Sequence, residues 1–180
     1  MTVALVRPRL ALVAVAAGCA VLTARPLLLA HATQPVTVVV VLFLSLLLVG
    51  VAWPGTRPAP KLVGPVLVIG VAAFALGRLF GGPSGAPVAG RLVVLNILAA
   101  VAEEAFFRRL VFGVLAANGA GSAIIGSAVL FATVHVTVYG AWVLPVDLAA
   151  GLVLSWQRWA SGTWRVPALT HVVANLLVVI

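Results

Sequence analysis

The stretch Ala102-Glu103-Glu104-Ala105-Phe106-Phe107-Arg108-Arg109-Leu110 decides the fold, because it places four charged side chains inside an apolar run from Leu92 to Ala116. The rest of the chain is poor in charge: 8% of its 180 residues are charged and 64% are hydrophobic. The mean hydropathy is +1.27. Soluble domains are about half apolar and a quarter charged. The composition therefore excludes a water-soluble globular enzyme, a disordered chain and a coiled coil, and indicates an integral membrane protein.

Apolar runs alternate with turn-forming residues along the whole chain, and we interpret seven of them as membrane spans. The expected spans are Leu10–Thr23, Val36–Trp53, Leu62–Phe80, Leu92–Ala116, Ala123–Tyr139, Trp142–Trp156 and Trp164–Ile180. Gly- and Pro-rich connectors at 54–60 and 81–87 separate some of them, and all five tryptophans lie at expected span ends, where interfacial rings are typical. The first run is short unless it continues through Pro26 to Ala30. We predict one integral-membrane domain over residues 1–180.

The eleven basic residues outnumber the three acids and give a net charge of +8. They are scattered rather than gathered in one patch, so we expect a lipid bilayer and no nucleic acid as partner. With the N-terminus inside, the inner segments hold Arg7, Arg9, Arg57, Lys61, Arg158 and Arg165, and the outer segments hold Arg25, Arg78 and Arg91. This excess predicts a cytoplasmic N-terminus in a multi-pass protein of the cell membrane, with a bacterial inner membrane as the expected setting.

The single cysteine, Cys19, excludes an intrachain disulfide. It ends the stretch Ala16-Ala17-Gly18-Cys19, which follows two arginines and an apolar run. A signal peptide with a lipoprotein-like cleavage site is therefore an alternative to an ordinary first helix with a buried cysteine.

The four charges of the deciding stretch are costly in a membrane. An ionised side chain costs about 2.5–3.5 kcal/mol at the centre of a span, and such residues mark function by default. On a helix Glu104 and Arg108 are i and i+4, so we expect them to pair. Glu103 is turned about 100° away and is left free for chemistry, while Arg109 is expected to extend toward an interface. The plain alternative is an ion pair that only fixes helix register.

Further polar residues lie in the last three expected spans. His135 is in the fifth, and His171 and Asn175 share one side of the last at i and i+4. A single buried histidine is more often a packed residue, but with Glu103 these residues form a polar set on three helices, as sites in helix bundles are built. We therefore predict an all-α, polytopic transmembrane helix bundle with an intramembrane polar cavity. Asp147 could join the site, pair with an arginine or face a water-filled cavity.

This set of side chains suits amide hydrolysis. A carboxylate and an imidazole can share a water, with Glu103 as general base and His135 as its partner. A second histidine and an asparagine are donors for a developing oxyanion. The same Glu103, His135 and His171 are a ligand set that zinc hydrolases use, although the chain contains no His-Glu-x-x-His motif. The residues alone leave both chemistries open.

Three motifs, Glu103-Glu104-x-x-x-Arg108, Phe131-x-x-x-His135 and His171-x-x-x-Asn175, resemble those of the CPBP intramembrane proteases. This family is also called the CaaX protease or Abi family and includes the eukaryotic CaaX prenyl endopeptidase. The resemblance covers a motif-bearing core of about residues 91–180. It implies a helical bundle around a membrane-embedded cavity, with glutamate-dependent, metal-free chemistry. The roles it implies are water activation by Glu103 and His135, oxyanion stabilisation by His171 and Asn175, and support of the site by Glu104 and Arg108.

We therefore expect an intramembrane endopeptidase without a cofactor, acting on membrane-associated peptides or proteins, with zinc as the alternative cofactor. A non-enzymatic membrane scaffold, or a transporter-like protein that relays protons or ions through the buried charges, is the main alternative function. A weaker one is a rhomboid-like serine protease, because Gly82-Pro83-Ser84-Gly85 fits a Gly-x-Ser-Gly pattern with His171 as partner. The sequence does not identify the substrate.

Overall fold

The structure, a computed structural model, describes residues 8–53, 62–80 and 90–179. These residues form helices and contain no strand. In order they are α1 (Pro8–Ala30), α2 (Pro35–Ala52), α3 (Val63–Phe80), α4 (Gly90–Glu104), a π-helical segment η1 (Ala105–Val111), α5 (Phe112–Leu115), a short 3-10 turn η2 (Ala116–Asn118), α6 (Ala120–Tyr139), a second 3-10 turn η3 (Ala141–Val143), α7 (Leu144–Ser161) and α8 (Arg165–Val179). The all-α prediction is confirmed.

The helices follow the expected spans in order, because α4, η1, α5 and η2 continue one another as the fourth span. The first span does continue through Pro26, which lies inside α1. Among the described helices, α1, α2 and α6 have the length and apolar character needed to cross a membrane. Large apolar side chains such as Leu27, Leu48 and Leu79 are more than 60% exposed, as expected for a surface that faces lipid. The chain is a helical membrane protein.

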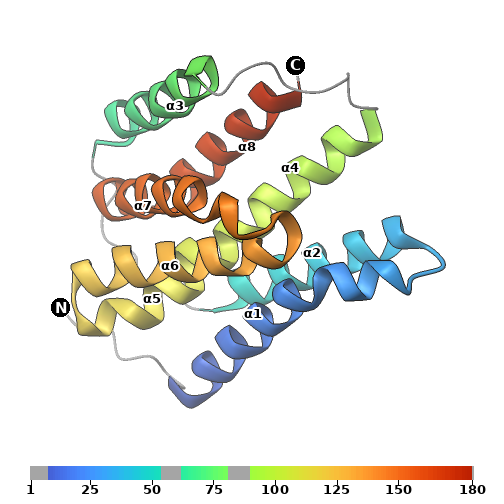
Figure 1. The fold of residues 1–180 in the computed structure, drawn as a ribbon. Helices are drawn as coiled ribbons and strands as arrows, with labels where there is room; N and C mark the ends of the chain where they lie inside the picture. The colour runs from blue at the N-terminus through green and yellow to red at the C-terminus, as the bar shows by residue number, and fades with distance from the viewer. Residues whose placement is uncertain (1–7, 54–61, 81–89, 180) are drawn as a thin grey trace.

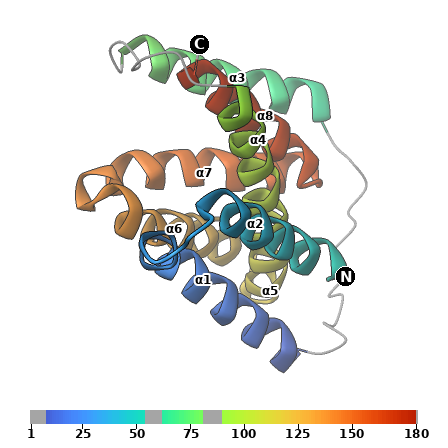
Figure 2. The same ribbon diagram turned by 90° about the vertical axis from the view of Figure 1, so that its right-hand side faces the viewer.

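Helix α4 lies at the centre of the bundle. It packs against α8 on one side and α2 on the other (Figure 1). Helices α6 and α7 pack along each other, and α3 covers α7 and α8. In both ribbon views α3 and α1 lie at opposite edges of the molecule (Figure 2). Because α4 is the middle element, the side chains at its end reach neighbours on several helices.

The deciding stretch contains the most unusual backbone of the fold. Residues Ala105–Val111 form a π-helix, whereas the sequence predicted an uninterrupted α-helix there. Two of its carbonyl oxygens accept hydrogen bonds from side chains of neighbouring helices: Ser127 Oγ donates to Phe107 O and Arg158 Nε donates to Arg108 O, each at 2.9 Å. Segments of π-helix inside α-helices often occur at functional sites. These bonds fix the helical turn that directly follows Glu103 and Glu104.

A glycine allows α2 to reach this segment. A Cβ added to Gly50 would lie 2.5 Å from the carbonyl carbon of Ala105 and 2.8 Å from the nitrogen of Phe106. Backbone this close admits no side chain at that position, as at small-residue contacts between membrane helices. The next turn is held as well, since Arg109 donates to Val51 O at 2.9 Å and to Trp53 O at 3.1 Å. Arg109, which was expected to extend toward an interface, therefore caps the end of α2.

Several arginines used in the orientation argument are not in connecting segments. Arg25, Arg78 and Arg158 lie within α1, α3 and α7 and make specific contacts there. Their charges serve packing or the cavity and give no information on sidedness, so the orientation stays a prediction. Arg7, Arg57 and Lys61, the connectors at 54–60 and 81–87, and Ser84 of the rhomboid-like pattern lie outside the described residues.

Candidate active site

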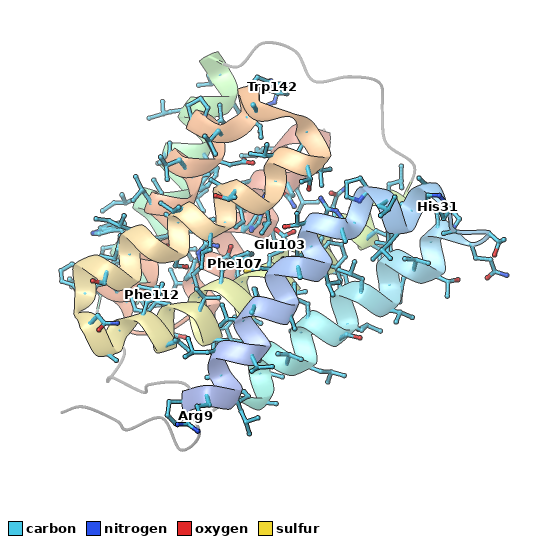
Figure 3. All side chains as sticks on the ribbon, turned by 60° about the horizontal axis from the view of Figure 1, so that its bottom comes forward. Arg9, His31, Glu103, Phe107, Phe112 and Trp142 are labelled. Carbon is cyan, nitrogen blue, oxygen red and sulfur yellow. The ribbon has the colours of Figure 1, made fainter. Side chains whose placement is uncertain are left out.

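A cavity of about 1420 Å³ lies among the helices and is walled mainly by apolar side chains. The polar residues on its wall are Arg25, Arg78, Asn96, Glu103, His135, Tyr139, Asp147, His171 and Asn175. Glu103 lies in the interior of the bundle, whereas Arg9, His31 and Trp142 lie at its periphery (Figure 3). The structure thus brings Glu103, His135, His171 and Asn175 to one hollow, where the sequence predicted a polar cavity.

Glu103 and His135 face each other across α4 and α6. The Nε2 atom of His135 lies 3.8 Å from Oε2 of Glu103, and Glu103 is only 4% exposed. The Nδ1 atom of His135 lies 2.7 Å from the carbonyl oxygen of Phe131, which can only accept, so Nδ1 carries the proton. In a neutral ring Nε2 is then an acceptor opposite a carboxylate. Two acceptors at this separation suit a water that donates to both.

Glu104 is fully buried behind the cavity and binds two partners. Its Oε1 lies 3.2 Å from Nη1 of Arg108 and 2.9 Å from Nδ1 of His171. The pair with Arg108 confirms the i, i+4 prediction. The bond to His171 comes from a residue 67 positions away, and the sequence analysis did not foresee it. Glu104 therefore joins α4 to α8 as well as holding its neighbour on the same helix.

Arg108 is also fully buried and is embedded in aromatic surface. Its guanidinium lies 4.5 Å from the ring centroid of Phe131 and 5.8 Å from that of Phe107, and Nη2 donates to Gly151 O at 3.2 Å. These contacts connect the Glu104 carboxylate to α6 and α7. Arg108 lies behind the wall of the cavity and does not line it.

His171 and Asn175 lie one turn apart on α8, and both line the cavity. Because Nδ1 of His171 is bound to Glu104, Nε2 is the nitrogen left for the cavity. Asn175 donates from Nδ2 to Asn96 O at 3.4 Å, a long bond to the backbone of α4. Near the end of α8, Arg78 Nε donates to Leu177 O at 3.1 Å. This bond ties the turn that carries Asn175 to α3.

The cavity contains two arginines that the sequence analysis did not assign to it, Arg25 and Arg78. Arg25 extends from α1 so that Nη1 lies 4.0 Å from Oε1 of Glu103, and its guanidinium lies 5.6 Å from the ring centroid of Phe43. The sequence feature that could have predicted the place of Arg25 is the extension of the first apolar run through Pro26, which puts this arginine inside a span.

Asp147, for which three roles were open, lines the cavity from the first turn of α7. Its Oδ2 atom is shielded from solvent and has no hydrogen-bond partner among the described residues.

A resident metal does not fit these positions. Within residues 8–53, 62–80 and 90–179, no three His, Cys, Asp or Glu side chains gather as a metal-binding group would. The set considered as a zinc alternative, Glu103, His135 and His171, is not gathered into such a group. The absence of a cofactor stays a prediction.

Comparison with known proteins gives one match. A sequence model of the family described as type II CAAX prenyl endopeptidase Rce1-like matches residues 85–177, just over half of the chain. The matched segment contains all three motifs but not α1, α2 or α3. No curated protein and no solved structure matches the chain.

Proposed function

Since the chain belongs to the Rce1-like family of type II CAAX prenyl endopeptidases, we propose that it is an intramembrane endopeptidase that hydrolyses peptide bonds of membrane-associated peptides or proteins with an activated water. Family membership supports a CAAX-type endopeptidase in general terms. The observation that carries the mechanism is the 3.8 Å approach of Glu103 Oε2 and His135 Nε2 on the wall of the cavity. We further propose that the protein is multi-pass in the cell membrane, with a bacterial inner membrane as its setting.

In the proposed reaction, Glu103 and His135 hold the nucleophile. A water donates one hydrogen bond to the Glu103 carboxylate and one to the unprotonated Nε2 of His135, which leaves an oxygen lone pair free to attack the scissile carbonyl carbon. As the bond forms, Glu103 takes the proton of the attacking water. Arg25 lies beside the same carboxylate and balances its negative charge in the apolar interior.

The carbonyl oxygen becomes an oxyanion, and α8 supplies its donors. His171 already donates Nδ1–H to Glu104, so it can donate from Nε2 only as an imidazolium, and the Glu104 carboxylate compensates that charge. The second N–H of the Asn175 amide is the other donor. When the tetrahedral intermediate collapses, Glu103 gives its proton to the leaving nitrogen and the C–N bond breaks. A preorganised donor of this kind contributes about 10²–10³ in rate.

The test uses purified protein in proteoliposomes with a library of membrane-associated peptides, prenylated and unprenylated. We expect E103Q and H135A to lower kcat/KM by about 10²–10⁴, and N175A by at least tenfold. The matched controls are H31A and N118A, which change an exposed histidine and an exposed asparagine. Size-exclusion profiles and thermal midpoints check that each variant is folded.

Two results would overturn the proposal. If wild type cleaves none of the peptides and E103Q keeps the cellular phenotype, the protein is a scaffold or a relay instead. If a chelator abolishes cleavage and zinc restores it, the metal-free mechanism is wrong; we expect full activity after chelation.

A further inference from the structure

Asp147 is the one acid of the chain that the proposed reaction does not use. The sequence has only three acids, and all lie in or behind the same cavity. Glu103 lies beside Arg25 and His135, and Glu104 is bound by Arg108 and His171. No cation or donor reaches Oδ2 of Asp147 from any described residue, although this atom is shielded from solvent.

An unpartnered, shielded carboxylate oxygen is unfavourable, because burial removes its water without replacing the lost hydrogen bonds. The two cavity arginines do not supply the partner. Arg25 lies next to Glu103, and Arg78 bonds to the backbone of α8. A positively charged group on a molecule that enters the cavity would supply this missing partner.

The surroundings of Asp147 suit an elongated cationic side chain. Tyr139 and Trp142 line the same cavity just before α7, and they are 53% and 73% exposed, so they form its rim. Aromatic faces attract ammonium and guanidinium groups and also cover aliphatic stems. A lysine or arginine side chain that enters past this rim can place its charge against the Asp147 carboxylate.

The position is close to the reacting groups. Asp147, Glu103, His135 and His171 all line the same cavity. Tyr139 stacks on the ring of His135 with centroids 6.0 Å apart and planes 9° from parallel. A side chain held at Asp147 therefore belongs to a residue near the bond that Glu103 and His135 would attack.

We infer that Asp147, with Tyr139 and Trp142 at the rim, forms a specificity subsite for a lysine or arginine side chain of the peptide substrate, within a few residues of the scissile bond. The inference rests on the proposed function, because it assigns a substrate feature to the same cavity. Asp147 contacts the substrate and has no part in the water attack.

The cleavage test uses internally quenched peptides in proteoliposomes that differ only by lysine or norleucine at each position flanking the cleaved bond. At one position we expect wild type to prefer lysine by at least tenfold in kcat/KM. D147N should lose this preference, because it should slow cleavage of the lysine peptide alone. D147E should retain most of the preference for lysine. D147R should instead prefer a peptide with glutamate at the same position. Equal cleavage of both peptides by wild type at every position, or an equal loss on both with D147N, would overturn the subsite.

A binding measurement separates this inference from the proposed function. E103Q and the double variant E103Q/D147N are titrated with the fluorescent lysine and norleucine peptides, and binding is followed by anisotropy. We expect tighter binding of the lysine peptide by E103Q and no discrimination by the double variant. If wild type cleaves nothing but this pattern appears, the hydrolase proposal fails and the cation subsite stands. If both proteins bind the two peptides equally, the subsite is wrong whatever the cleavage result.

Discussion

Glu104 is the point where a change should cost the most, and the structure allows the cost to be worked out. E104Q keeps an oxygen that can accept from His171 but removes the negative charge beside Arg108. That guanidinium is 0% exposed, its Nε atom has no hydrogen-bond partner among the described residues, and its Nη1 atom has only the ion pair with Glu104. Only the bond from Nη2 to Gly151 O and the nearby aromatic rings remain.

Removing one partner of a buried ion pair costs about 3–5 kcal/mol, because the other charge stays buried without compensation. The lower end of this range applies to E104Q, because the bond to His171 can survive. We therefore expect the free energy of unfolding to fall by about 3 kcal/mol. At 1.4 kcal/mol per tenfold, this is roughly a hundredfold shift in the unfolding equilibrium. In the double variant E104Q/R108M neither position carries a charge, so no member of the pair is left buried alone and most of the loss should be recovered.

The assay is reversible unfolding in mixed micelles of mild detergent and dodecyl sulfate, followed by helical circular dichroism. The reasoning is refuted if E104Q unfolds within about 1 kcal/mol of wild type, or if E104Q/R108M is no more stable than E104Q. Peptide cleavage adds an independent readout. The double variant should stay inactive even though it is stable, because His171 loses the carboxylate that holds its Nδ1 atom.

Two further predictions concern α1 and α2, which lie outside the segment matched by the family. G50A should lower the free energy of unfolding by about 1–3 kcal/mol in the same assay, because its Cβ would push α2 away from Ala105. The control is G113A, whose Cβ would meet nothing within 4 Å, and it should not lose stability. Equal losses in both variants would contradict the argument from the close approach of α2. R25Q should lower kcat/KM at least tenfold, a change of about 1.4 kcal/mol in activation free energy, because Glu103 loses its counter-charge. R9Q, at the exposed start of the same helix, should leave cleavage unchanged. Wild-type activity in R25Q would show that Arg25 is not part of the site.

The sequence predicted the features that depend on near neighbours in the chain. Long apolar runs between turn residues give the helices and their order, because a span must satisfy its own backbone hydrogen bonds in lipid. The pair of Glu104 and Arg108 follows from helical spacing alone. The polar residues of the cavity stand out because so few charges occur elsewhere, although their catalytic roles stay predictions.

Other features required the packed molecule. The bond from His171 to Glu104, the approach of Arg25 to Glu103 and the unpartnered oxygen of Asp147 all depend on how each helix is rotated about its axis. Hydrophobic periodicity gives little information on that rotation in a membrane protein, because the face toward lipid and the face toward other helices are both apolar. The π-helical turn after Glu104 was not foreseen for a related reason. Its extra carbonyl contacts are made to Ser127 and Arg158, which reach it only when α6 and α7 are in place.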